Sequence, residues 1–144
     1  MSRVEGRVLG VDLGSRRIGL ALSDPTRTLA SPLAVLERTG DRSREHRAIV
    51  DAAREHEATT IVVGLPRSLS GAEGPAARDA RAEVADLRAV AGDDLAIEMY
   101  DERLTTVTAQ RSLVEAGVRR DARRRVVDKV AAAVMLQGWL ERHA

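Results

Sequence analysis

Residues 7–24 read RVLGVDLGSRRIGLALSD, and this stretch predicts the β-hairpin around which the rest of the chain is arranged. The apolar run of residues 8–11 is typical of a buried strand, and large and small apolar residues alternate over residues 18–22, the period of a second strand. Gly14 lies between them, where glycine can take a positive φ and permit a tight reversal. Asp12 ends the first strand, and a charge there is costly unless it is paired. A turn aspartate and a functional carboxylate are both compatible with this position.

The composition is that of an ordinary soluble globular protein. The chain has 144 residues, 44% hydrophobic and 31% charged, which predicts a single domain over residues 1–144. It contains no cysteine, so disulfides, thiolate catalysis and zinc–thiolate sites are excluded. No apolar run approaches the roughly 20 residues of a membrane span, and none follows Met1 as in a signal peptide. We therefore expect a cytoplasmic protein without a membrane partner.

Positive charge is carried almost entirely by arginine, since Lys129 is the only lysine. Arginine is the better fork for phosphate, whereas an aromatic content of 1% argues against modules that stack bases on aromatic platforms. Contacts to nucleic acid are therefore expected at its backbone. The densest run of positive charge either contacts the backbone of a nucleic acid or is a solvated charge cluster. Its arginines are Arg119, Arg120, Arg123, Arg124 and Arg125.

The remaining periodicities predict the element order βββαβαβαα. Three strands with short connections form an antiparallel meander, and right-handed crossovers then add parallel strands. The fold class is therefore α/β, a five-stranded mixed sheet with helices on both faces. The expected strands are residues 8–11, 18–22, 29–36, 59–64 and 95–99, and the expected helices are residues 41–56, 75–92, 106–117 and 126–140.

Side chains of the helix expected over residues 41–56 divide into an apolar stripe at residues 49–53 and a charged face that includes Glu45. Trp139 is predicted to be a core or interface residue. The histidines fall on presumed polar faces and are predicted to be incidental; they are His46, His56 and His143.

Acidic residues stand at the ends of two predicted strands and within the last helix. Asp12 ends the first strand, Asp101 and Glu102 end the fifth, and Asp128 lies among valines and alanines. Ligand sites of such sheets lie at the carboxyl ends of the strands, so these positions are expected to lie side by side. Carboxylates without histidine or cysteine suit Mg²⁺ or Mn²⁺. Two such ions about 4 Å apart can activate a water for phosphodiester hydrolysis.

The chain resembles the YqgF (RuvX) family in motifs that span nearly its whole length in the family's order. Members are described as pre-16S ribosomal RNA nucleases or as Holliday junction resolvase homologues, with an RNase H-like fold. The motifs are LGVDLG (9–14), RIG (17–19), SD (23–24), VGLP (63–66), DERLTT (101–106), DKVAA (128–132) and LQ (136–137).

Carried over to this chain, the resemblance implies Asp12, Glu102 and Asp128 as the catalytic, metal-binding acids. Asp101 could bind metal as well, although pairing with an arginine or capping of the next helix is favoured. Arg17 and Arg103 could position the scissile phosphate or pair with neighbouring acids, and both interpretations stay open.

The resemblance further implies a metal-dependent nuclease that processes the 5′ end of pre-16S rRNA in ribosome biogenesis. The alternatives are a Holliday junction resolvase in DNA recombination or repair, and a non-catalytic RNA-binding module. Retention of three acids argues against the pure binder, because negative charge beside phosphates weakens binding. A resolvase needs two active sites on one symmetric substrate, whereas either a monomer or a weak homodimer is expected here.

Overall fold

The computed structural model describes residues 6–65, 75–101 and 120–143. Within these ranges the element order agrees with the prediction, and the helix expected before Gly117 lies outside them. No helix in the described part of the chain is both long and apolar enough to cross a membrane. The elements are β1 (Arg7–Leu13), β2 (Arg17–Ser23), β3 (Ala30–Glu37), α1 (Arg42–Glu55), β4 (Ala58–Leu65), α2 (Pro75–Ala91), β5 (Ala96–Asp101) and α4 (Arg120–Arg142).

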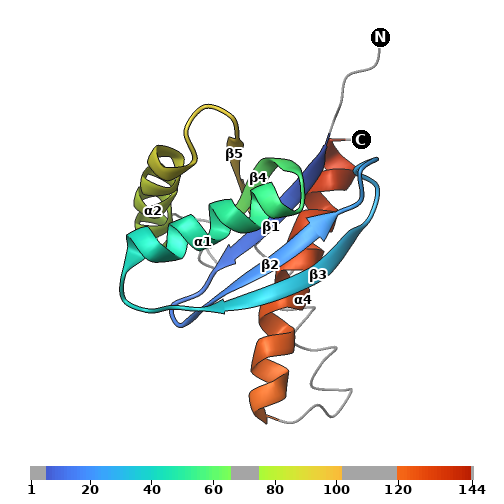
Figure 1. Ribbon diagram of the computed structural model, residues 1–144. Coiled ribbons are helices and arrows are strands. Elements are labelled where there is room, and N and C mark those ends of the chain that lie inside the picture. Colours follow the sequence, from blue (N-terminus) through green and yellow to red (C-terminus); the bar gives the residue numbers. More distant parts are fainter. Residues whose placement is uncertain (1–5, 66–74, 102–119, 144) are drawn as a thin grey trace.

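The five strands form one mixed sheet in the order β3-β2-β1-β4-β5 (Figure 1). β1, β2 and β3 are antiparallel neighbours, whereas β4 runs parallel to both β1 and β5. The predicted meander with two added parallel strands is confirmed. The expectation that the ends of β1 and β5 lie side by side is wrong. β4 lies between these two strands and separates their ends by two strand spacings, about 10 Å. The uninterrupted apolar sequence of β4 is suited to this central, fully covered position.

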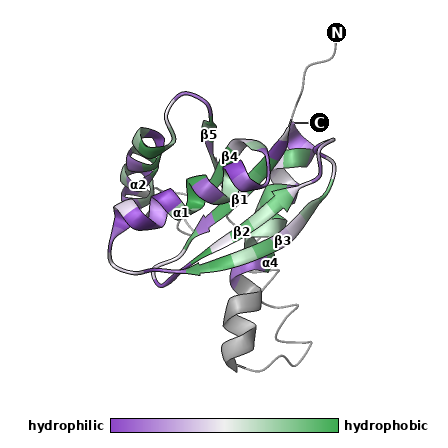
Figure 2. Ribbon diagram, in the orientation of Figure 1, coloured by the Kyte–Doolittle hydropathy of each residue, from purple (hydrophilic) through white to green (hydrophobic). Residues whose placement is uncertain are grey.

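Helices cover both faces of the sheet, as predicted: α1 and α2 lie on one face and α4 lies on the other (Figure 1). Leu9 and Val11 of β1 pack in the core beneath α1 and α2, whereas Val8 packs with α4. Trp139 belongs to the α4 core, which confirms its predicted role. Figure 2 shows hydrophobic residues concentrated along the strands and hydrophilic residues in the first turns of α1.

Two local features follow from the chemistry of single residues. Asp41 is the N-cap of α1, and its side chain accepts a hydrogen bond from the amide of Arg44 at 3.2 Å. Pro32 lies in β3, an edge strand of the sheet, where a missing backbone donor can be tolerated.

Gly14 is required for a different reason from the one predicted. The described glycines with a positive φ are Gly6, Gly40 and Gly92, so Gly14 is not among them. Its amide donates to the carbonyl of Arg17 at 2.9 Å, and a Cβ at this position would lie 2.5 Å from the same oxygen. The tight approach of the two backbone segments therefore excludes a side chain.

Candidate active site

Asp12 lies near the carboxyl end of β1, on the face of the sheet that α4 covers. Gly10 faces α4, because a Cβ there would lie 2.9 Å from the Cβ of Leu136. Side chains alternate along a strand, so Asp12 is on the same face as Gly10. In the antiparallel ladder, Asp12 is paired with Gly19 of β2.

Gly19 allows the backbone of α4 to reach the sheet beside Asp12. A Cβ on Gly19 would lie 2.1 Å from the carbonyl oxygen of Asp128 and 2.6 Å from its carbonyl carbon. Asp12 and Asp128 therefore adjoin the same glycine, one across the ladder and one from the helix above. The two acidic residues lie in one corner between β1, β2 and α4.

The contact between α4 and the sheet repeats along the helix. Asp128, Ala132 and Leu136 are four residues apart and share one helix face. Ala132 and Leu136 approach Gly10, as Asp128 approaches Gly19. Figure 1 shows that the first turns of α4 extend past the edge of the sheet. The sheet glycines therefore set both the depth of α4 and the position of Asp128.

A side chain at position 19 is expected to damage this packing. Gly19→Ala should lower the free energy of unfolding by about 1–3 kcal/mol, because the helix backbone must move to admit the methyl group. Gly138→Ala is the matched control at the same interface. Its Cβ would meet the hydroxyl of Tyr100 at 3.0 Å, a side-chain atom that can move. Urea unfolding of both variants tests the difference, and equal stability would contradict the proposed close contact.

The carboxyl group of Asp128 is incompletely compensated by its surroundings. Burial raises its pKa, the charge of Arg17 lowers it, and the charge of Glu37 raises it further, with a net increase. A carboxyl group in this state gains from any additional cation placed beside it.

Arg17 is held by an acidic residue of the neighbouring strand. Its Nε donates to Glu37 Oε2 at 3.3 Å, and the two residues are paired in the register of β2 and β3. The side chain of Glu37 is 52% exposed, whereas that of Arg17 is 21% exposed. Of the two interpretations of Arg17, pairing with an acid is therefore realised, and phosphate binding stays a prediction.

If Arg17 also binds phosphate, Glu37 competes with the substrate. Glu37→Gln is then expected to tighten RNA binding by roughly twofold to fivefold, because an exposed ion pair is worth about 0.2–1 kcal/mol. Fluorescence anisotropy of a labelled RNA duplex measures this effect. Glu55→Gln, an equal charge change at an exposed position of α1, is the control. The same tightening in both variants would assign the effect to net charge alone.

The side chains of the other predicted site residues are not described by the structure. Asp101 is the last residue of β5, and its backbone pairs with Leu65. The described residues contain no group of three or more histidine, cysteine, aspartate or glutamate residues that could hold a metal ion. Glu102, Arg103 and Arg119 are outside the described ranges, and Arg120, Arg123, Arg124 and Arg125 contribute backbone to the first turns of α4.

The SD motif, Ser23 and Asp24, lies at the opposite end of the strands from Asp12 and has structural roles. The hydroxyl of Ser23 accepts a hydrogen bond from the amide of Val8 at 2.8 Å. Asp24 Oδ1 accepts from the amides of Thr28 and Leu29 at 2.7 and 2.8 Å. The Ser23 bond joins β2 to β1, and the Asp24 bonds close the loop between β2 and β3, away from Asp12.

A buried charged cluster on the α1 and α2 face was not predicted from the sequence. The cluster consists of Arg38, Glu45, His46 and Glu83. Glu45 is only 5% exposed and His46 only 1% exposed. The predictions that Glu45 lies on the charged face of α1 and that His46 lies on a polar face are wrong. His46 precedes Ile49, Val50 and Ala53 at helical spacing, and this signal could have revealed its burial.

The family follows from comparison with known proteins. Residues 6–142 match the family described as "RuvX: Holliday junction resolvase". The chain belongs to the RuvX family. A relative from Mycobacterium sp. (strain KMS) is 47% identical over 136 residues, covering 94% of this chain and 80% of the relative. A relative from Rhodococcus opacus (strain B4) is 45% identical over 139 residues, covering 94% and 78%. Both carry the name "Putative pre-16S rRNA nuclease".

A solved structure supports the same fold for this RuvX family member. The protein described as "T. thermophilus RuvC in complex with Holliday junction substrate" aligns with a TM-score of 0.51 and 17% identity, covering 96% of both chains. At this identity the likeness concerns the fold alone. The RNase H-like fold implied by the sequence motifs is confirmed.

Proposed function

We propose that this RuvX family member is a metal-dependent nuclease that processes the 5′ end of pre-16S rRNA. The observation that carries the proposal is the corner in which Asp12 and Asp128 adjoin Gly19. It lies toward the carboxyl edge of the sheet, where sheets of this kind bind their ligands. The names of the relatives favour ribosomal RNA as the substrate.

The donor chemistry of this corner fits a hard divalent cation. Carboxylate oxygens are the ligands that Mg²⁺ and Mn²⁺ prefer, and Glu102 is the proposed third donor. The raised pKa of Asp128 supports this assignment, because a bound cation would compensate the buried charge. When bound, a pair of such ions would supply charge that activates water and stabilises the leaving oxygen. Asp12 and Asp128 would hold the cations, and Arg17 would orient the phosphate after release from Glu37.

A second candidate is cleavage of branched DNA, which the description of the family favours. The two candidates share the proposed chemistry and differ in the shape of the nucleic acid. Junction cleavage also requires two active sites on one substrate, so it predicts a dimer on the DNA.

Parallel cleavage assays distinguish these functions. The purified chain is incubated with a 5′-extended 16S precursor RNA fragment or a four-way DNA junction, in Mg²⁺ or in chelator. We expect Mg²⁺-dependent cleavage of the RNA on the 5′ side of the mature end, and none by Asp12→Asn, which controls for contaminating nucleases. Preferred cleavage of the junction would establish the second candidate. Binding of RNA without cleavage would establish the non-catalytic RNA-binding module.

A further inference from the structure

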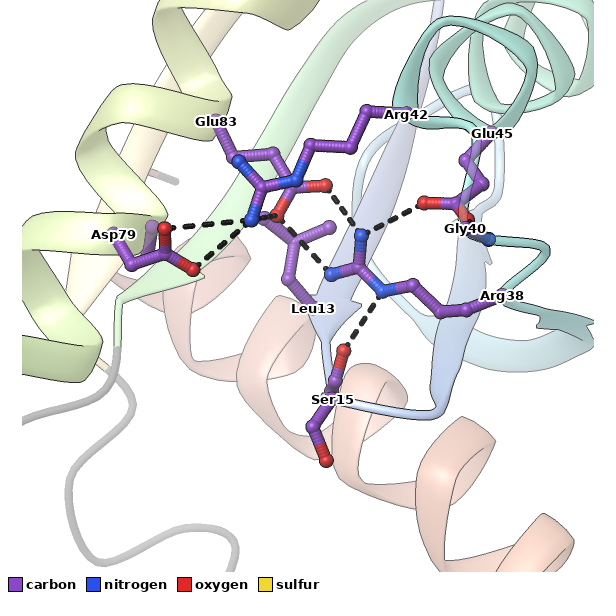
Figure 3. A pocket seen from close by; sticks show the side chains of 10 residues that line it. Leu13, Ser15, Arg38, Gly40, Arg42, Glu45, Asp79 and Glu83 are labelled. Atoms are coloured by element: carbon purple, nitrogen blue, oxygen red, sulfur yellow. Dashed lines mark hydrogen bonds and ion pairs between the residues drawn. The ribbon is translucent and has the colours of Figure 1, made fainter.

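The buried charged cluster lies beside the β1–β2 turn and between α1 and α2 (Figure 3). Leu13 packs on this face, and side chains alternate along a strand, so Asp12 lies on the opposite face of the sheet. Arg38, the residue after β3, is at its centre. Its guanidinium donates to both carboxylate oxygens of Glu83 at 2.6 and 3.1 Å and to Glu45 at 3.0 Å. Its Nε donates to the carbonyl of Gly14 at 2.9 Å. One side chain thus joins the β1–β2 turn to α1 and α2.

The acids of this cluster are nearly fully enclosed and have several donors. The side chains of Glu45 and Glu83 are each 3% exposed. Glu45 also accepts from the amides of Thr39 and Gly40 at 2.7 and 2.9 Å, and Glu83 lies 2.8 Å from His46 Nε2. Burial alone would raise the pKa of Glu83, but hydrogen bonds from Arg38 and His46 hold it below its usual value.

Residue 38 holds the β1–β2 turn at two points. Besides the bond from its side chain to Gly14, its amide donates to the carbonyl of Arg16 at 2.9 Å. The turn is closed by the bond from the amide of Gly14 to the carbonyl of Arg17. Asp12 and Arg17 flank this turn, so its position determines where both side chains enter the candidate active site.

A cluster of this kind is poorly explained by stability alone. Buried ion pairs often contribute no more to stability than well-packed apolar residues of similar volume. A fixed guanidinium with several bonds does, however, hold three separate elements in one geometry. Catalysis depends strongly on such geometry, since a misplacement of about 1 Å can cost 100-fold in rate.

We propose that Arg38 is a positioning residue for the candidate active site, and that it acts by fixing the β1–β2 turn against α1 and α2. The effect on cleavage rests on the proposed nuclease function, whereas the effect on the turn does not. Arg38 contacts neither Asp12 nor the reacting phosphate in this role. It acts through the backbone of Gly14 and Arg16.

Arg38→Lys separates the two functions of the side chain. A lysine keeps the charge that compensates Glu45 and Glu83, but it has a methylene carbon, Cε, where arginine has the Nε that donates to Gly14. The matched control is Arg42→Lys. Arg42 lies beside the cluster: it is 3.8 Å from Glu83 and 3.1 Å from Asp79, and among the described residues it makes no hydrogen bond to the turn. Both variants keep their positive charge, so the attraction to nucleic acid is preserved.

We expect Arg38→Lys to lower kcat for RNA cleavage by about 10–100-fold with unchanged RNA affinity, and Arg42→Lys to cleave like the wild type. Backbone hydrogen exchange at Gly14 should accelerate about tenfold in Arg38→Lys, because a hydrogen bond to a charged group is lost. Exchange at Ile61 in β4 should not change. A purely structural role would instead change exchange throughout the core and leave kcat of the folded fraction unaltered.

Equal cleavage by the two lysine variants, or unchanged exchange at Gly14, would overturn the positioning role. If Arg38→Lys fails to fold, the double variant Arg38→Gln with Glu83→Gln removes opposite charges together and takes its place in both measurements. A wild-type protein that cleaves no RNA or junction would contradict the nuclease proposal. Exchange at Gly14 would then decide alone whether Arg38 holds the turn.

Discussion

Asp12→Asn is expected to lower Mg²⁺-dependent cleavage by at least about 100-fold and to leave the fold intact. The amide preserves the shape of the side chain but removes the charge that would hold the cation. Loss of an outer partner of a metal ligand already costs about 10–100-fold, so loss of a ligand should cost no less. We expect the same result for Asp128→Asn and Glu102→Gln. Single-turnover cleavage at saturating enzyme measures the chemical step.

The control for this experiment is an acid outside the candidate site. Asp86→Asn changes the same charge at an exposed position of α2 and should cleave at the wild-type rate. Activity within threefold of the wild type in Asp12→Asn, Glu102→Gln or Asp128→Asn would remove that residue from the site. Asp101→Asn tests the remaining ambiguity, because a loss as large as that of Glu102→Gln would make it a ligand.

Asp128→Asn should be more stable than the wild type at neutral pH in the presence of chelator. Burial raises the pKa of Asp128, so the folded protein carries a charge that it disfavours. Replacement by the neutral amide removes this cost together with repulsion from Glu37. We expect the melting temperature to rise by about 2–4 °C, the shift that 1 kcal/mol produces in a domain of this size.

The gain in stability of Asp128→Asn over the wild type should increase as the pH rises. Between the unfolded pKa of an aspartate, about 3.9, and the raised folded pKa, the folded state binds more protons than the unfolded state. Rising pH therefore lowers the contribution of Asp128 to the free energy of unfolding across this window. The advantage of Asp128→Asn should be complete above the folded pKa and absent below the unfolded pKa. Melting curves from pH 3 to pH 8 measure it.

Magnesium should reverse the order of stability, so that the wild type becomes more stable than Asp128→Asn. A cation that binds only the native state stabilises it by about 2.7 kcal/mol at a hundredfold excess over its dissociation constant. The wild type should therefore gain more from millimolar Mg²⁺ than Asp128→Asn, which lacks a ligand. A variant that is less stable in chelator and responds equally to Mg²⁺ would show that Asp12 and Asp128 do not share a cation.

Local patterns in the sequence were sufficient for the architecture. The hairpin of residues 7–24, the cap at Asp41, the edge strand with Pro32 and the central strand β4 all follow from periodicity and turn chemistry. These features depend on a few neighbouring residues, so they can be predicted without knowledge of the rest of the chain. The family motifs likewise suggested Asp12 and Asp128 before their positions were known.

Contacts between elements were decided only by the tertiary structure. Charged residues are usually exposed, so Glu45 in isolation reads as part of a solvated helix face. It is buried because Arg38, from the end of another element, supplies its partner. Gly14 likewise reads as a turn glycine, although the close carbonyl of Arg17 is what excludes a side chain.

The corner formed by Asp12, Gly19 and Asp128 combines both kinds of information. By itself, the sequence determined the strands, the helix and the acidic residue types that they carry. Only the tertiary structure decided that the backbone of α4 lies against Gly19, and hence that Asp12 and Asp128 both lie next to this glycine. The physical reason is that local propensity acts within one element, whereas close packing and the pairing of buried charges act between elements distant in the chain.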